Sequence, residues 1–445
     1  MPLPAHRPWL ASAARDLMTP GLVLIGIGLV SWLVQRGFKH GSGPYRDFFD
    51  FYHAAAAVRL GENIYTSGDG GYIYPPLLAV LLQPMSRLEP VVAANTWTVL
   101  CAIMLVISAS LLSSAASLAF RLYLRPWHVL AAAAFSCLVV GESLKTEFGW
   151  NNSNMLVLLA VSLGVHSMDR RPVVSGLALA LGASIKYLPI VFLPYFVLRR
   201  RWGHAAAMAI GLLVFNLLPA LQLGWEKNLE YLRVALRGML NMVGGKAEGP
   251  AAAIHTVSSE YSWSIPSAAA RFVERIGGQP TMTVAITVGC AVLLLAAGWG
   301  LYVFHRVPLW RGRHGGLDRA APGGSGVVLL EGVGLITGAI MFSPQTTRSH
   351  MTLLVALVSV LAVLLLYGRA GLARLLLISA LGCITLGALS APAFPFLKAF
   401  LVEWRTYGGP MLGIAACYLL VLWVGLREVT SNRLGFPVPR RDRAA

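Results

Sequence analysis

The chain has 445 residues, of which 56% are hydrophobic and only 12% are charged, and its formal net charge is +17. Several apolar runs approach the roughly twenty residues that a membrane-spanning helix needs, and polar loops separate them. This composition excludes an ordinary water-soluble domain and a protein with a single span. It predicts an all-α, polytopic membrane protein that forms one integral domain over residues 1–445.

The apolar runs predict about twelve transmembrane helices. The first run, at residues 17–34, lacks a small-residue cleavage site, so we interpret it as a retained helix and not as a signal peptide. The predicted helices lie at residues 17–42, 92–119, 127–144, 155–168, 173–185, 187–198, 203–221, 281–304, 327–342, 350–367, 371–391 and 408–426, and we expect the first to end near Val34.

The basic residues are distributed unevenly over the loops between these helices. With both termini in the cytoplasm, the short cytoplasmic loops and the termini hold 20 of the 36 lysines and arginines. The short outer loops hold five, and the other eleven lie in two long outer segments. Because short cytoplasmic loops of membrane proteins are enriched in Lys and Arg, this asymmetry supports the orientation. It also accounts for the net charge without a nucleic-acid partner.

This topology predicts two large extracytoplasmic segments, at residues 36–91 and 222–280. It also predicts a basic cytoplasmic loop at residues 305–326 and a cytoplasmic tail at residues 428–445. Within the first outer segment, YPPLLAVLLQPMSRLEP is apolar but short for a span and has prolines near both ends. We therefore expect it to form a re-entrant segment that enters the membrane and returns on the same side.

The first outer segment contains DFFDFYHAAAAVRLG, which predicts a helix at the membrane surface that ends at Gly61. At about 100° per residue, its apolar stripe is formed by Phe48, Phe51, Tyr52, Ala55 and Val58. Asp47 lies roughly 70° from this stripe and Asp50 about 130° from it, so we expect Asp47 to face the protein and Asp50 to face water. An acid at such a boundary can act as a general base. Alternatively, Asp47 caps the start of the helix.

Four motifs follow one another along the chain: DFFDFYHAAAAVRLGENIY, YIYPPLLAVLLQPMSRL, SGLALALGASIKYLPIVFLPYFVLRRRW and SPQTTRSH. Over residues 45–355, their order and spacing resemble the signatures of the polyprenol-phosphate-mannose-dependent alpha-mannosyltransferases, glycosyltransferase family 87 of the GT-C class. The resemblance implies an inverting hexosyltransferase that moves a sugar, mannose by preference, from a polyprenyl-phosphate donor to a hydroxyl of a glycolipid or glycan acceptor. It further implies a multi-pass protein among the lipids of a bacterial cytoplasmic (inner) membrane, with an extracytoplasmic active site.

The family pattern puts its catalytic acid on Asp47 and leaves Asp50 as a second acid beside it. The acceptor hydroxyl must lose a proton as it attacks the anomeric carbon, and a nearby carboxylate can accept that proton. The leaving phosphate is stabilised by cations, for which the resemblance offers Lys186, Arg348 and His350. From the residues alone, Lys186 can instead extend to the interface, and Arg348 and His350 can be ordinary interfacial side chains.

The resemblance also implies residues that contact the sugar or the acceptor. Asn152 and Asn154 stand where the family has Gln and Asn, and their amides can bind sugar hydroxyls or cap the next helix. Trp263 can stack on a sugar ring and Arg271 can meet phosphate, or both can be interfacial residues. Tyr74 can contact substrate, or it shapes the turn before the two prolines.

The sequence departs from the family pattern in one motif and contains no metal-binding motif, and two other functions have to be considered. Thr347 and Ser349 stand where better-known members of the family have Trp and a double histidine. The chain has no Asp-x-Asp pair, no His-Glu cluster and no Gly-rich phosphate loop, so we expect no metal and no other cofactor. The alternative function is a flippase or transporter of lipid-linked sugars, which would place charges near the membrane midplane on broken or repeated helices. A structural scaffold would leave the acidic and aromatic helix unexplained.

The topology can be tested at Ser67, in the first predicted outer segment. A cysteine introduced there should react in intact cells with a thiol reagent that cannot cross the membrane. All five native cysteines lie in apolar runs, so the unmodified protein is the matched background. Labelling of Ser67→Cys only after lysis would reverse the predicted orientation.

Overall fold

The computed structural model describes residues 8–41, 46–69, 71–243, 249–250, 256–307, 324–368, 372–388 and 395–431. Over these ranges the chain is helical and contains no β-strand, so the all-α class is confirmed for the described residues. Most of the predicted basic loop at residues 305–326 and of the predicted tail at residues 428–445 lies outside them.

Seven segments of the described chain are long and apolar enough to cross a membrane. They are α1 (Pro8–Arg36) with η1 (Gly37–Gly41), α4 (Pro90–Ala119), α10 (Trp202–Leu217) with α11 (Ala220–Leu223), α14 (Pro280–Phe304), α15 (Gly324–Phe342), η4 (Arg348–Leu354) with α16 (Val355–Tyr367), and α19 (Gly409–Ser431). An eighth arises if α5 (Pro126–Val139) and α6 (Gly141–Trp150), which meet at 75°, form one broken span.

Shorter apolar helices account for the remaining predicted spans. They are α7 (Asn154–Ser167), α8 (Pro172–Ile185), η3 (Leu188–Val191) with α9 (Phe192–Leu198), and α17 (Leu372–Ala388). An apolar helix therefore occurs at each predicted position. By length and composition, however, only seven or eight of the described segments qualify as spans, so the number of about twelve stays a prediction.

Three predicted helices differ from the structure in extent. The span predicted at residues 127–144 ends at Val139, and the chain turns by 75° into α6. The span predicted at residues 187–198 begins as a 3₁₀-helix, with Pro189 in its first turn, where no backbone N–H is needed. The first helix does not end near Val34 but continues to Arg36, whose side chain is held by the backbone of Lys145.

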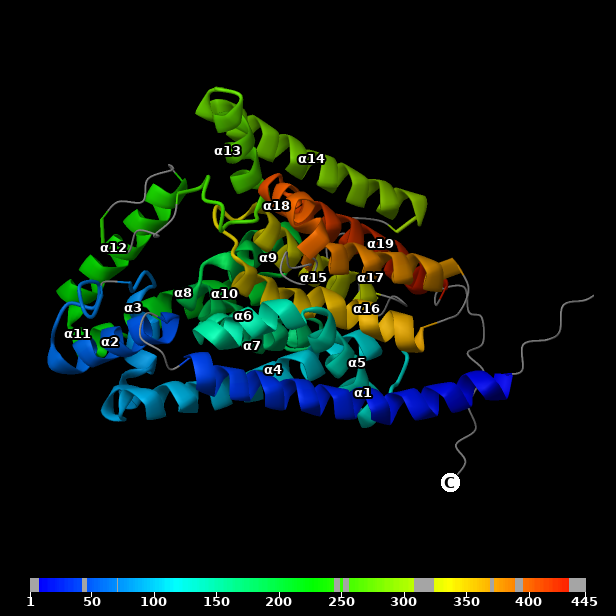
Figure 1. Ribbon diagram of the computed structural model, residues 1–445, viewed down its shortest axis with the longest axis horizontal. Helices are drawn as coiled ribbons and strands as arrows, with labels where there is room; N and C mark the ends of the chain where they lie inside the picture. The colour runs from blue at the N-terminus through cyan, green and yellow to red at the C-terminus, as the bar shows by residue number, and fades with distance from the viewer. Residues whose placement is uncertain are drawn as a thin grey trace, which may run out of the picture.

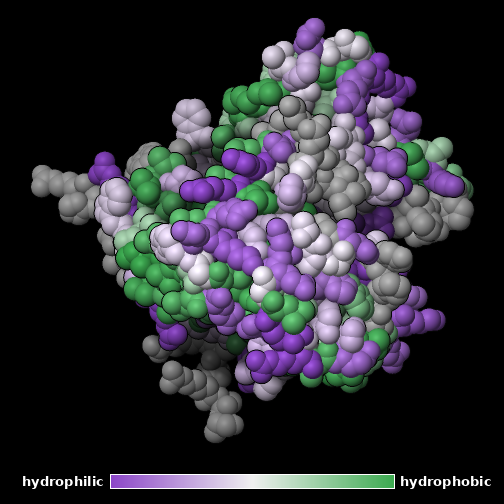
Figure 2. Space-filling view, turned by 90° about the vertical axis from the view of Figure 1, so that its left-hand side faces the viewer, coloured by the Kyte–Doolittle hydropathy of each residue, from purple (hydrophilic) through white to green (hydrophobic). Residues whose placement is uncertain are grey.

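The helices outside the apolar spans include α2 (Asp47–Leu60), α3 (Pro76–Leu81), η2 (Gln83–Arg87), α12 (Trp225–Val243), α13 (Ile265–Arg275), η6 (Pro395–Leu397) and α18 (Lys398–Thr406). In Figure 1, α2, α3 and α12 lie at the left end of the bundle, and α13 and α18 lie at the top, nearer its middle. Hydrophilic side chains spread over much of the left-hand side of the molecule, with hydrophobic patches between them (Figure 2). The predicted re-entrant segment consists of α3 and η2, which are six and five residues long and too short to cross a membrane.

A buried carboxylate ties three helices together inside the bundle. Glu331 of α15 accepts hydrogen bonds from Tyr195 of α9 at 2.7 Å and from Tyr302 of α14 at 3.1 Å. It also forms an ion pair with Arg199, which follows α9 and is buried. Because α14 is otherwise peripheral, with no buried side chain in its most apolar 18 residues, this contact anchors it to the bundle.

We expect Arg199→Met to lower the melting temperature of the purified protein, because Glu331 would lose the cation that compensates its charge. Breaking a buried ion pair by removing one partner costs about 3 to 5 kcal/mol. Arg200→Met is the matched control, since Arg200 is the next residue and is exposed. Equal melting temperatures for the two variants would show that the pair does not stabilise the fold.

Candidate active site

Four helix ends meet where α2, α6, α7 and α8 approach one another. Because four residues join α7 to α8 and the two helices pack together, the start of α7 at Asn154 lies beside the end of α8 at Ile185. Helix α6 ends at Trp150, just before α7 begins, and α2 begins at Asp47. The polar side chains at these ends therefore come from distant parts of the sequence.

Helix α2 is anchored by its aromatic residues. Phe48 and Phe51 are fully buried, with the Phe48 ring 6.2 Å from Trp97 and the Phe51 ring 5.4 Å from Tyr74. The helix ends as predicted at Gly61, which has φ of 76°, a conformation that glycine adopts without strain. This packing confirms the predicted apolar stripe and sets the direction of the acids at the start of α2.

A chain of hydrogen bonds links two acids through a lysine. Asn152 Nδ2 donates to the Asp47 carboxylate, and Lys186 Nζ donates to Asn152 Oδ1 at 2.8 Å. Lys186 Nζ also donates to Asn154 Oδ1 at 2.6 Å, and Asn154 Nδ2 donates to Glu147 Oε2 at 2.8 Å. We call Asp47, Asn152, Lys186, Asn154 and Glu147 the lysine network. Asn152 Oδ1 also accepts a hydrogen bond from the backbone N–H of Ser153 at 2.6 Å, at the start of α7, where the side chain of Ser153 itself forms no capping bond.

The lysine of this network is buried inside the protein. Lys186 is 6% exposed, and its Nζ lies 5.1 Å from the centre of the Tyr74 ring. Its side chain therefore does not extend to the interface, which was the alternative interpretation. Burial lowers the pKa of Lys186, while the charges of Glu147 and Asp47 oppose that change.

The two acids of α2 have different surroundings. Burial raises the pKa of Asp47, against the opposing effects of Lys186, Asn152 and Arg46. Burial, followed by repulsion from Asp47 and Asp69, raises the pKa of Asp50 to about 6. Asp47 faces the protein as predicted.

Asp50 departs from its expected orientation, because its carboxylate is only partly exposed and lies against Gly71. A side chain at position 71 would bring its Cβ to 2.4 Å from Asp50 Oδ1, so glycine permits this close approach.

The turn between α6 and α7 is stabilised by Asn151, which our sequence interpretation did not single out. Asn151 has φ of 51°, a left-handed conformation that asparagine tolerates better than most residues. Its Nδ2 donates to Thr98 Oγ1 at 2.9 Å, and its carbonyl accepts from Trp97 Nε1 at 3.1 Å. The sequence also left Glu147 unassigned, although an acid between apolar helices is costly unless it has a partner.

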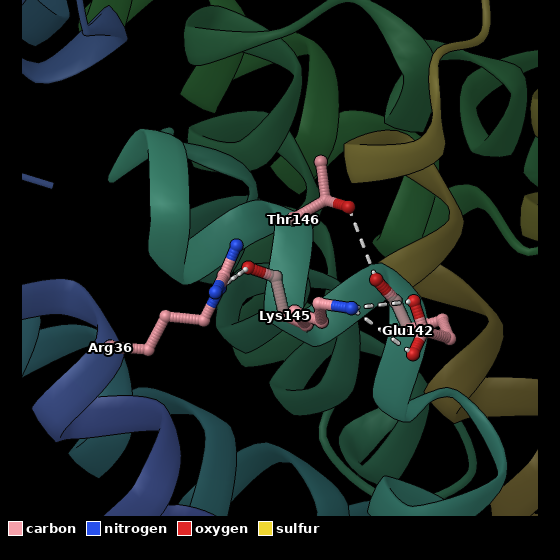
Figure 3. A network of polar contacts seen from close by, with 4 residues as sticks. All are labelled: Arg36, Glu142, Lys145 and Thr146. Carbon is pink, nitrogen blue, oxygen red and sulfur yellow. Dashed lines mark hydrogen bonds and ion pairs between the residues drawn. The ribbon is translucent and has the colours of Figure 1, made fainter. Parts of the chain in front are cut away.

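The position of Glu147 depends on how α6 is held across the kink. Arg36 Nε at the end of α1 donates to the carbonyl of Lys145 at 3.0 Å, and Lys145 Nζ lies 3.3 Å from Glu142 (Figure 3). Thr146 Oγ1 donates to the Glu142 carbonyl at 3.1 Å. These contacts fix α6 against α1 and direct the next residue, Glu147, toward the lysine network.

A second group of polar residues surrounds Trp263, which is 6% exposed. The Arg348 guanidinium lies 5.0 Å from the centre of its ring, and that of Arg405 lies 5.8 Å away. The backbone N–H of Trp263 donates to the Thr346 carbonyl at 2.8 Å. We call Trp263, Arg348 and Arg405 the arginine cluster. Both guanidinium groups approach the ring of Trp263, so the indole supports the two arginines.

His350 and Arg271 are engaged within the protein. His350 Nδ1 accepts a hydrogen bond from the Thr347 backbone at 3.1 Å, at the start of η4, which packs against α6 and α7. Arg271 donates to the carbonyls of Ser259 at 2.6 Å, Ser262 at 2.9 Å and Thr406 at 2.9 Å. Arg271 thereby ties the loop before Trp263 to the end of α18.

The structure brings five predicted site residues together in one place, namely Asp47, Asn152, Asn154, Lys186 and Tyr74. Arg348, Trp263 and Arg271 belong to the neighbouring cluster or support it. Among the described residues, no group of three or more His, Cys, Asp or Glu side chains is arranged to hold a metal ion. The lysine network offers a carboxylate held by an amide, which is a suitable arrangement for accepting a proton.

The raised pKa of Asp50 predicts a pH-dependent effect of Asp50→Asn on stability. A carboxyl whose pKa is near 6 when folded and 3.8 when unfolded favours folding while protonated, and this contribution is lost as the pH rises through 6. The melting temperature of Asp50→Asn should therefore be close to that of the wild type at about pH 4 and higher at about pH 7.5. Glu62→Gln, which removes an exposed acid after α2, should show no such change. A difference between Asp50→Asn and wild type that is constant with pH would contradict the assignment.

The sequence profile of glycosyltransferase family 87 matches residues 72–315. The chain is 29% identical over 225 residues to the polyprenol-phosphate-mannose-dependent alpha-(1-2)-phosphatidylinositol mannoside mannosyltransferase of Mycobacterium tuberculosis, a match covering 46% of this chain and 51% of the relative. It is 25% identical over 233 residues to the Mycolicibacterium smegmatis protein of the same name, covering 48% and 51%.

The chain thus matches about half the length of these curated relatives. The family profile covers more than half of the chain, including the whole lysine network except Asp47. This protein belongs to glycosyltransferase family 87.

Proposed function

We propose that this protein is a membrane-bound mannosyltransferase. It moves a mannosyl unit from a polyprenyl-phosphate carrier to a hydroxyl group of a glycolipid or glycan. The lysine network is the observation that carries the proposal, because it holds the Asp47 carboxylate in one orientation through Asn152. Family membership and the names of the two relatives support the donor and the type of reaction. They favour a transferase over a transporter of lipid-linked sugars.

The reaction is a single displacement at the anomeric carbon. The acceptor hydroxyl gives its proton to the Asp47 carboxylate while its oxygen forms a bond to the anomeric carbon. The bond from that carbon to the phosphate oxygen breaks, and polyprenyl phosphate leaves with the electron pair. One displacement inverts the configuration of the carbon. The raised pKa of Asp47 makes its carboxylate a better proton acceptor than an exposed aspartate.

Lys186 orients the base and stabilises its charge in this mechanism. Two of the three ammonium N–H groups are used by Asn152 and Asn154, so contact with the donor phosphate depends on the third. Arg348 and His350 remain the proposed phosphate ligands on η4. Asn152, Asn154 and Tyr74 are the proposed contacts of the sugar or the acceptor, and Asp50 is the secondary acid.

We place the reaction on the extracytoplasmic side of the inner membrane, with both termini in the cytoplasm. The uneven distribution of lysine and arginine supports this orientation. It makes residues 36–91 and 222–280 the two outer segments, so α2 and α12 both lie on the outer side. The acceptor named for the relatives, a phosphatidylinositol mannoside, is the first glycolipid to try.

Asp47→Asn should lower turnover by about a hundred- to ten-thousand-fold, which is the usual contribution of a general base. The amide keeps the size of the side chain, so the folded protein should be retained. Turnover is measured with purified protein, polyprenyl-phosphate mannose and phosphatidylinositol mannoside.

Asp50→Asn is the matched comparison and should lower turnover far less, because Asp50 lies outside the lysine network. Equal losses in both variants would indicate an acid pair that acts together. Loss in Asp50→Asn alone would show that Asp50 is the base.

A further inference from the structure

The arginine cluster brings two cations to one indole ring. Arg348 comes from η4 and Arg405 from α18, and both guanidinium groups approach Trp263. Each arginine is partly buried. Arg405 Nε donates to the carbonyl of Leu401 in its own helix at 3.1 Å. Among the described residues, the Arg348 guanidinium forms no hydrogen bond.

Among the described residues, neither Arg348 nor Arg405 has a carboxylate within ion-pair distance. Glu142, the acid whose charge acts on Arg348, is paired with Lys145. Two like charges that share a half-buried position repel each other unless an anion lies between them. The arginine cluster therefore has the charge and the free donors of an anion site, and arginine forks suit phosphate oxygens.

An apolar cavity of about 510 Å³ begins beside this cluster. Tyr407 and Gly408 line it two and three residues after Arg405, and Ile265 lines it two residues after Trp263. Its other walls come from α14, α15 and α19, including Cys290, Leu293, Met341 and Met411. Arg271 joins the two segments at this end of the cavity by bonding to the carbonyls of Ser262 and Thr406. Two cations within a few residues of the wall of an apolar cavity match a lipid with an anionic head.

We propose that the arginine cluster binds the phosphate of the polyprenyl-phosphate donor and that the cavity between α13, α14, α15 and α19 holds the first isoprene units of its chain. The inference rests on the proposed function. It adds Arg405 and the cavity, both of which lie partly or wholly beyond the region matched by the family profile.

The donor fits this site better than a glycolipid acceptor does, because of where each carries its phosphate. In the donor, phosphate is bonded directly to the reacting carbon, whereas in a phosphoglycolipid sugars separate the phosphate from the reacting hydroxyl. Arg348 lies on η4, which packs against the two helices that carry Glu147 and Asn154. A phosphate held by Arg348 would therefore lie on an element that packs against the helices of the lysine network, on which the leaving group must also lie.

Cys290 provides a direct test that does not depend on activity. It lines the cavity, while Cys101, Cys137 and Cys417 are buried elsewhere and Cys383→Ser removes the other partly exposed thiol. In lipid nanodiscs, undecaprenyl phosphate should slow the reaction of Cys290 with N-ethylmaleimide. Undecaprenol, which lacks the phosphate, should protect Cys290 only at a concentration about tenfold higher.

Variants of the cluster and of the cavity separate the two parts of the site. Arg405→Gln should raise about tenfold the concentration of undecaprenyl phosphate that gives half-protection of Cys290. Arg405→Lys keeps the charge and should restore part of this loss. Ala415→Phe should reduce protection by filling the cavity while the arginines stay in place. Arg237→Gln, which removes an exposed arginine of α12, should leave the protection of Cys290 by undecaprenyl phosphate unchanged.

The proposal is wrong if undecaprenyl phosphate leaves the modification rate of Cys290 unchanged. It is also wrong if undecaprenol or phosphatidylinositol protects equally well, or if Arg405→Gln keeps full protection. Wild-type turnover separates this failure from that of the proposed function. If the protein transfers mannose but Cys290 is unprotected, only the cavity assignment fails. If it transfers no sugar from any polyprenyl phosphate, the proposed function fails, and the donor assignment with it.

Discussion

The buried charge of Lys186 is the constraint on which the rest of the site depends. An ammonium group that is 6% exposed at the end of an apolar helix is strongly destabilising unless anions and hydrogen-bond acceptors surround it. Asn152, Asn154, Glu147 and Asp47 supply these partners. Compensation of one charge therefore fixes the ends of α2, α6, α7 and α8 relative to one another. The same contacts orient the Asp47 carboxylate, so the stability of this region and the chemistry proposed for it have one origin.

Broken and shortened helices make room for this polar site within an apolar bundle. The chain turns by 75° between α5 and α6, and α8 ends at Ile185, just before Lys186 and the 3₁₀ turn that contains Pro189. Each interruption places polar side chains at a helix end, where backbone groups are unpaired and polar residues are tolerated. Arg36 and Asn151 then hold the interrupted segments in place. The ends of the shorter helices thus provide the positions at which the polar residues of the site lie.

Family similarity and three-dimensional structure describe overlapping but different parts of the site. The profile match at residues 72–315 contains most of the lysine network. Asp47 precedes that region, and Arg348 and Arg405 follow it. The fold joins all three to this region, through the contacts of Asp47 with Asn152 and of the two arginines with Trp263. Residues outside the matched region therefore contact residues inside it, as the proposed reaction requires.

The sequence by itself determined the helical class, the positions of the apolar segments, the extent of α2 and the inward direction of Asp47. These features follow from local periodicity and from Gly61, and both are visible in a short stretch of chain. The sequence did not reveal the kink after Val139, the position of Asp50 against Gly71, or the contacts of Glu147, Asn151 and Arg405. Only the tertiary structure decided these features, because each depends on a contact with a residue that is distant in sequence or that lies on another helix. A buried charge or amide acquires its role from the group that compensates it, and hydrophobic periodicity does not identify that group.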